Sequence, residues 1–190
     1  MGRVMKPLRE MGASIEGKND NFCPLTLYPS ELHGMNYRLP VASAQLKSAI
    51  LLAGLYAEGQ TTVIEPAPSR DHTERMFRAL GVEIETNGST ITLDPPEDLH
   101  AVDIAVPGDI SSAAFFLVAG AIVPSSELTI KNVGVNPTRT GVLDVLRDMG
   151  ADITESNFRD EAEPMCDLTV KYSKLHGVEI GGAIIPRLID

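Results

Sequence analysis

Apolar and polar residues follow two patterns along the chain, and each pattern predicts a different element. Alternation over a few residues predicts a half-buried strand, and apolar residues every three to four positions predict an amphipathic helix. Residues 43–56 are apolar nearly all round, which is typical of a buried helix. In chain order, the expected elements are a strand at 37–41, a helix at 43–56, a strand at 60–64, a helix at 70–80, and strands at 82–86 and 90–94. This order is β-α-β-α-β-β, with a hairpin turn predicted at Asn87-Gly88.

The pattern repeats along the chain. Gly12, Gly81 and Gly150 recur every 69 residues, and each follows a helical segment and precedes an alternating one. Glycine at such a place is expected to end a helix in a left-handed conformation. Ala53-Gly54 likewise matches Ala119-Gly120. The sequence therefore predicts an α/β fold of repeated β-α-β-α-β-β units.

The other copies are incomplete or less regular. One copy is entered at a helix near residues 3–11, followed by strands near 14–17 and 25–28. The next copy should contain a strand at 102–106, a helix at 111–122, a strand at 127–133, a helix at 140–149, and closing strands near 152–155 and 167–172 joined by an acidic surface loop. Because the chain starts and stops inside a unit, we expect a fragment of a longer protein.

Composition narrows the class of protein. The 190 residues are 43% hydrophobic and 22% charged, which indicates a globular chain, and no apolar run is long enough for a membrane span. The net charge of −10 argues against a nucleic-acid binder, which would show a basic face. Four scattered histidines have no metal-ligand spacing, so no metal is expected. Cys23 and Cys166 lie far apart without CxxC partners, which favours reduced thiols and a cytoplasmic protein.

The strongest candidate site is the start of the buried helix, at Ser43-Ala44-Gln45. Free backbone N–H groups at a helix N-terminus attract anions, and Ser43 and Gln45 can donate and accept hydrogen bonds. Ser43 could equally be only a helix cap. Lys47 could contact a ligand, be solvated, or pair with a carboxylate.

Two further helix starts carry polar residues. Arg70 lies at the start of the helix at 70–80, where its guanidinium suits a phosphate or carboxylate. His72 has no evident Ser or Cys partner in the sequence, and we interpret it as a structural or surface residue. Residues 106–113 contain Gly-Asp-Ile-Ser-Ser but lack the spacing of a nucleotide-binding loop, so they are interpreted as a capped, buried helix start.

Five segments resemble one known family. They are Ser-Ala-Gln-Leu-Lys-Ser-Ala (43–49), Ser-Arg-Asp-His-Thr-Glu-Arg-Met (69–76), Val-Pro-Gly-Asp-Ile-Ser-Ser-Ala-Ala-Phe-Phe (106–116), Asn-Pro-Thr-Arg-Thr-Gly (136–141) and Ile-Pro-Arg-Leu-Ile-Asp (185–190). They look like the 5-enolpyruvylshikimate-3-phosphate synthase family, in its glyphosate-tolerant class II bacterial branch. The resemblance covers essentially the whole chain and implies the enolpyruvyl transferase fold, an inside-out α/β barrel of six such units in two lobes. Residues 1–135 would be repeat units of one lobe without its N-terminal part. Residues 136–190 would cross into and begin the next unit, whose C-terminal part is missing.

The resemblance also implies an activity. The family transfers the enolpyruvyl (1-carboxyvinyl) group of phosphoenolpyruvate to the 5-hydroxyl of shikimate 3-phosphate in the shikimate pathway, without a cofactor. Ser43, Ala44, Gln45 and Arg70 would bind substrate, with Ala44 standing where other branches have a second serine. Asp190 would be the catalytic proton acceptor. The implied protein is a cytoplasmic monomer with small-molecule substrates as its only partners.

The sequence departs from the family at both ends. The family's N-terminal lysine loop and its C-terminal-lobe arginines would lie outside the chain, so we expect the chain alone to be inactive. Two alternatives stay open at this point. One is a UDP-N-acetylglucosamine 1-carboxyvinyltransferase, which shares the fold and uses a cysteine acid. The other is a repeat scaffold without catalysis.

Overall fold

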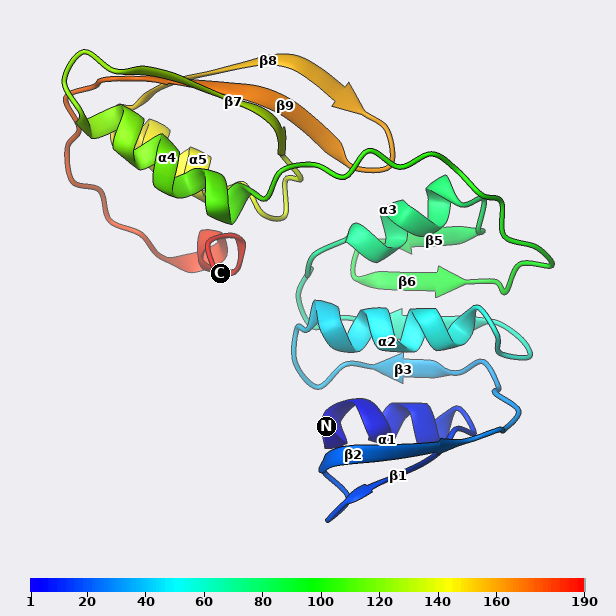
Figure 1. Cartoon of the computed structure of the whole chain (residues 1–190). Helices are drawn as coiled ribbons and strands as arrows, with labels where there is room; N and C mark the ends of the chain where they lie inside the picture. The colour runs from blue at the N-terminus through cyan, green and yellow to red at the C-terminus, as the bar shows by residue number, and fades with distance from the viewer. Residues whose placement is uncertain (190) are drawn as a thin grey trace. The chain divides into compact units, whose positions relative to one another are not determined.

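The chain forms two compact units, Met1–Val102 and Asp103–Asp190 (Figure 1). The computed structural model describes residues 1–189, and of Ala183 only the backbone. The compact units divide at Val102, whereas the sequence placed a boundary after residue 135. That boundary between lobe and crossover stays a prediction, but residues 103–135 belong by their contacts to the second unit.

The first unit contains one complete repeat. A four-stranded sheet has the order β3-β4-β6-β5, with β3 parallel to β4 and the other neighbours antiparallel. Its elements are β3 (Asn36–Arg38), α2 (Ala44–Gly54), β4 (Thr61–Ile64), α3 (His72–Ala79), β5 (Ile84–Asn87) and β6 (Thr90–Leu93). The predicted β-α-β-α-β-β order is confirmed. It is preceded by α1 (Gly2–Glu10) and the antiparallel pair β1 (Ser14–Lys18) and β2 (Phe22–Tyr28), also as predicted.

The core of the first unit lies between α2 and the sheet. Leu46, Ile50 and Leu51 of α2 are buried in one cluster with residues of β4, β5 and β6. Each such side chain contributes roughly 1.5–3 kcal/mol by leaving water. A Cβ on Gly54 would lie 2.8 Å from Leu93 Cδ2, so the glycine allows α2 to approach β6 closely.

The predicted hairpin is confirmed, one residue later than expected. Asn87 pairs with Thr90, so the two loop residues are Gly88 and Ser89 rather than Asn87 and Gly88. Gly88 has a φ of +59°. A glycine with positive φ at the first loop position matches the twist of the flanking strands, which leaves Asn87 inside the ladder.

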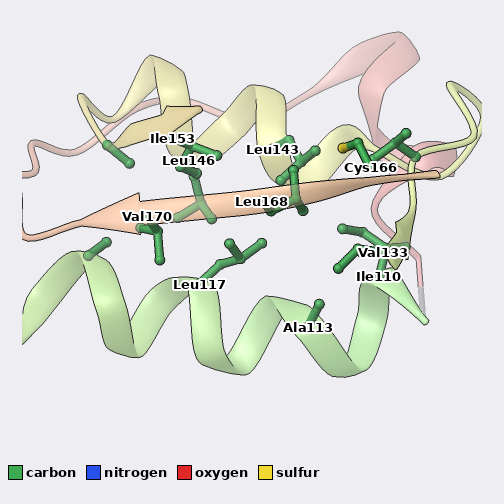
Figure 2. Packing of buried hydrophobic residues seen from close by; sticks show 13 residues of the cluster. Ile110, Ala113, Leu117, Val133, Leu143, Leu146, Ile153, Cys166, Leu168 and Val170 are labelled. Atoms are coloured by element: carbon green, nitrogen blue, oxygen red, sulfur yellow. The ribbon is translucent and has the colours of Figure 1, made fainter. Parts of the chain in front are cut away.

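The second unit repeats the arrangement around a three-stranded sheet of order β7-β9-β8. Its elements are α4 (Ile110–Ile122), β7 (Glu127–Gly134), α5 (Gly141–Asp148), β8 (Asp152–Asp160), β9 (Pro164–Lys171) and the 3-10 helix η1 (Gly182–Arg187). Figure 2 shows Leu168 and Val170 of β9 packed with Leu117 of α4 and Leu146 of α5. A Cβ on Gly120 would lie 2.5 Å from Val170 Cγ1, so this glycine has the same role as Gly54.

The strand predicted at residues 102–106 is wrong. These residues are exposed and form no strand, and the segment after them pairs with β7 at an isolated parallel bridge between Gly108 and Val133. Pro107 has no backbone N–H, which limits a ladder beside it. The apolar alternation of this segment is therefore not matched by burial.

The closing hairpin is longer than predicted. Residues 156–165 were expected to form a surface loop, but β8 and β9 continue through them to a short turn. Asp167 in β9 accepts hydrogen bonds from the Asn132 backbone N–H (2.8 Å) and from Asn157 Nδ2 (2.9 Å). Both asparagines have positive φ and sit where the strand register shifts. The hydrogen bonds from Asn157 and Asn132 lower the pKa of Asp167, so a carboxylate joins the irregular parts of β7 and β8.

The three repeat glycines behave as predicted. Gly12, Gly81 and Gly150 have φ values of +103°, +82° and +94°, and each directly follows the end of an amphipathic helix. Within the described residues, no helix combines the length and the apolar character that crossing a membrane requires.

Candidate functional site

The first candidate residues lie at the start of α2, as predicted. Ser43 is the N-cap, and its hydroxyl accepts a hydrogen bond from the Leu46 backbone N–H at 3.3 Å. Ala44 is the first helical residue and Gln45 is exposed. No acidic residue lies in the first turn, so the positive end of the helix dipole is not opposed by a carboxylate from that turn.

Arg70 lies in the loop between β4 and α3, and it is half-buried. Because β3 and β4 are parallel, the chain leaves both strands at the same edge of the sheet. Figure 1 shows that α2 and α3 accordingly begin at the same end of the first unit. The fold therefore brings Ser43, Gln45 and Arg70 to one edge, although the two segments are separated by 25 residues of sequence.

Lys47 is paired with carboxylates, which was one of the three readings left open by the sequence. Its side chain is only 1% exposed, and Nζ lies 3.1 Å from Glu65 Oε2 and 2.6 Å from Glu74 Oε1. The Ser69 hydroxyl donates to Glu65 Oε1, and Glu65 and Glu74 are themselves 4% and 2% exposed. Lys47 therefore joins α2 to both ends of the segment that carries Arg70.

A second polar contact lies beside this network. The hydroxyls of Ser48 in α2 and Thr73 in α3 are 2.6 Å apart and share a hydrogen bond. Two consecutive residues of α2 thus contact two consecutive residues of α3 through polar groups. The sequence did not indicate Glu65, Glu74 or Thr73 as part of the site, because nothing in their spacing reveals that they meet Lys47 and Ser48.

The start of α4 is a capped helix, as the sequence favoured. Asp109 accepts from the Ser112 backbone N–H and hydroxyl, both at 2.9 Å, and lies 3.3 Å from Arg139 Nη2. The hydrogen bond from the Ser112 N–H lowers the pKa of Asp109. A carboxylate of the chain thus occupies this helix N-terminus. The expected burial of this helix start holds on one face only: Ile110 and Ala113 are buried, whereas Phe115 is 80% exposed.

The predicted catalytic residue, Asp190, lies outside the described residues. The segment before it is tied to the start of α5. Arg187 Nη2 lies 2.8 Å from Asp144 Oδ2, and Arg187 Nε donates to the Pro137 carbonyl at 2.7 Å. In the part of the chain that is described, no three His, Cys, Asp or Glu side chains gather as metal ligands would.

The two cysteines occupy different environments. Cys23 is exposed in β2, whereas Cys166 is 1% exposed in β9. Burial, together with the nearby carboxylates of Glu155 and Asp167, raises the pKa of the Cys166 thiol to about 11. Such a thiol has little thiolate at neutral pH.

We therefore expect thiol reagents to distinguish the two cysteines. At pH 8 a thiol with a pKa near 11 is thiolate in about one molecule per thousand, so only Cys23 should react promptly in the folded chain. Mass spectrometry after brief iodoacetamide treatment should show one adduct on the native chain and two after unfolding. In Cys23→Ser, native labelling should disappear. Rapid labelling of folded Cys23→Ser would show that Cys166 is accessible.

The fold and site define the class of protein. It is an α/β repeat protein in which the N-terminus of α2, capped by the neutral Ser43, and Arg70 lie at one sheet edge, an arrangement suited to an anionic ligand. The family model described as EPSP synthase (3-phosphoshikimate 1-carboxyvinyltransferase) matches residues 1–189, and the chain belongs to this family.

Individual relatives agree with the family. A 3-phosphoshikimate 1-carboxyvinyltransferase of Geobacillus thermodenitrificans is 60% identical over 192 residues, covering 100% of this chain and 44% of that protein. The protein of the same name from Thermoanaerobacter pseudethanolicus is 56% identical, again over 100% of the chain. The solved EPSP synthase of Acinetobacter baumannii matches 98% of the chain and 43% of its own, with a TM-score of 0.91 and 47% identity. The chain thus spans somewhat less than half the length of these relatives.

Proposed function

We propose that this chain supplies part of an enzyme that transfers the enolpyruvyl group of phosphoenolpyruvate to the 5-hydroxyl of shikimate 3-phosphate, releasing phosphate. Its family membership and the names of its relatives support this assignment. The observation that carries it is the placement of the α2 N-terminus and Arg70 at one sheet edge, with Lys47 joining α2 to the segment that carries Arg70. Neither the UDP-N-acetylglucosamine enzyme nor a scaffold is favoured by any contact of the described residues, and a buried Cys166 is a poor acid.

Each proposed residue has a physical role. Ser43 and Gln45 would hold shikimate 3-phosphate through hydrogen bonds, helped by the free N–H groups of the α2 N-terminus. Arg70 would hold an anionic group by charge-assisted hydrogen bonds. Ala44 would contribute only its backbone N–H and the space of its methyl group. Asp190 would accept the proton of the attacking hydroxyl, a task that suits a carboxylate.

The chain alone is proposed to lack turnover. The second substrate, phosphoenolpyruvate, is also multiply anionic, and stabilising its transition state requires several cations placed around it. In the resemblance those cations come from segments beyond residues 1–190. The complete enzyme is proposed to be a cytoplasmic monomer that acts on small molecules without a cofactor.

Calorimetric titration with shikimate 3-phosphate tests the assignment. We expect the 190-residue chain to bind it weakly, and Gln45→Ala and Arg70→Ala each to weaken binding about tenfold or more, because each removes a hydrogen-bonding partner of a charged ligand. Arg3→Ala, which changes an exposed arginine of α1, serves as the control. Equal affinity in all four proteins would contradict a site at these helix starts.

A further inference from the structure

We propose that Lys47, Glu65 and Glu74 are positioning residues that hold the α2 N-terminus and the Arg70 segment at the separation that the ligand requires. The inference rests on the proposed function, since the ligand is taken to be shikimate 3-phosphate. None of the three is proposed to touch it. Each acts through its neighbours, Ser43 and Gln45 on one side and Arg70 on the other.

The contacts of Lys47 connect the two segments of the first unit that carry candidate site residues. Lys47 lies two residues after Gln45, and its ammonium contacts Glu65, five residues before Arg70, and Glu74, four residues after it. The segment between these carboxylates is fastened again by Ser69, whose hydroxyl and backbone N–H both donate to Glu65. Arg70 is therefore held from both sides by groups that share one ammonium.

Stability alone does not account for these charges. Moving a lysine and two glutamates out of water is costly, and replacing a buried ion group by apolar residues is often neutral or stabilising. Within the described residues, Glu74 Oε2 also accepts no hydrogen bond, so the burial of this carboxylate is only partly compensated. A defined geometry is what an ion network adds that apolar packing supplies less well.

The second unit shows that the fold forms without this network. The match of Gly54 to Gly120 places equivalent residues of α2 and α4 66 positions apart, so Lys47 corresponds to Ala113. The match of Gly81 to Gly150 places equivalent residues of α3 and α5 69 positions apart, so Glu74 corresponds to Leu143. Both belong to one apolar cluster, and Figure 2 shows them among the buried side chains of that unit. The same helix pair is thus held there by apolar side chains.

The N-termini of α2 and α4 also differ in charge. In the second unit, Asp109 caps α4 with a carboxylate that also pairs with Arg139, so an anion of the chain already occupies the N-terminus. In the first unit, the neutral Ser43 caps α2. The ion network therefore accompanies the helix start that is available to an external anion, and it is absent from the start that is already neutralised.

The test replaces the network by apolar and neutral side chains, following the second unit. Lys47→Met/Glu65→Gln/Glu74→Leu keeps similar volumes and leaves no buried charge unpaired. The matched control is Lys171→Met/Glu127→Gln, which removes an exposed ion pair of the second unit. Two properties are measured on the whole chain: affinity for shikimate 3-phosphate by calorimetry, and the relative orientation of α2 and α3 by residual dipolar couplings.

The triple variant is expected to stay folded, to change the angle between α2 and α3, and to bind shikimate 3-phosphate at least tenfold more weakly. A purely structural role would alter thermal stability without altering affinity. Wild-type affinity in the folded triple variant would overturn the inference while leaving the proposed function intact. If the wild-type chain itself shows no binding, the proposed site fails, and the dipolar couplings alone test the positioning role. An unchanged angle between α2 and α3 in the triple variant overturns that role. A changed angle supports it.

Discussion

Lys47→Met should destabilise the first unit by about 3–5 kcal/mol, because it leaves Glu65 and Glu74 buried without the ammonium between them. Lysine and methionine have similar length and volume, so the effect reports charge rather than a cavity. Native-state hydrogen exchange at Ile50 and Leu51, which are fully buried in α2, measures the opening of this unit by itself.

Two comparisons separate the electrostatic cause from others. Lys6→Met changes an exposed lysine of α1 and should alter stability by less than about 0.5 kcal/mol. The triple variant Lys47→Met/Glu65→Gln/Glu74→Leu should recover most of the loss, since no charge then stays buried. A Lys47→Met variant as stable as the wild type would contradict this prediction, because the ammonium would then not be what compensates the two buried carboxylates.

Gly12→Ala should destabilise the first unit by about 3–4 kcal/mol, the sum of a positive-φ penalty and a clash with backbone. Gly12 has a φ of +103°, and an added Cβ would lie 2.5 Å from the Glu31 carbonyl oxygen. This oxygen belongs to the backbone, so it cannot move aside by rotation as the end of a side chain can. Hydrogen exchange in α2 again measures the loss.

Two glycines of the same unit provide matched controls. Gly81 also has a positive φ, but its added Cβ would meet the His100 ring at 2.9 Å, which can rotate away. Gly88 has a φ of +59° and nothing within 4 Å of an added Cβ. Gly88→Ala should therefore cost only about 1–2 kcal/mol and Gly81→Ala slightly more. Equal losses at all three would show that backbone strain alone governs the cost.

Local patterns predicted the fold well where burial and periodicity agree. The helices around Leu51 and Phe77 formed where expected, and the predicted hairpin formed with its turn one residue later, because alternation, turn chemistry and apolar faces act over a few residues. The helix predicted to be apolar and buried nearly all round is buried on one face only, since Leu52 is 52% exposed. Residues 102–106 have the same alternation but no strand, since a strand also needs a partner at the right place. The longer β8–β9 hairpin was missed because its irregular part is held by Asp167, which binds Asn157 across the hairpin and Asn132, 35 residues earlier in the chain.

The candidate site was also predicted only in part. Ser43 as a cap and the carboxylate-paired Lys47 were both foreseen as possibilities from residue type alone. The identity of the partners was not, since Glu65 and Glu74 lie 18 and 27 residues away and look like ordinary acidic residues. The sequence signal that pointed to them is Lys47 as the one charged residue of a mostly apolar helix, where a buried charge needs a partner.

The sequence by itself determined the repeated unit, the order of its elements and the three helix-ending glycines. These features depend on periodicity and on the φ angles that glycine allows, both of which are local properties. Only the tertiary structure decided whether equivalent residues of the repeats have the same surroundings. Gly12 lies against a carbonyl and Gly150 has ordinary contacts, while Lys47 joins two carboxylates where Ala113 joins an apolar core. Equivalent positions differ because each side chain's environment is set by segments far away in the chain.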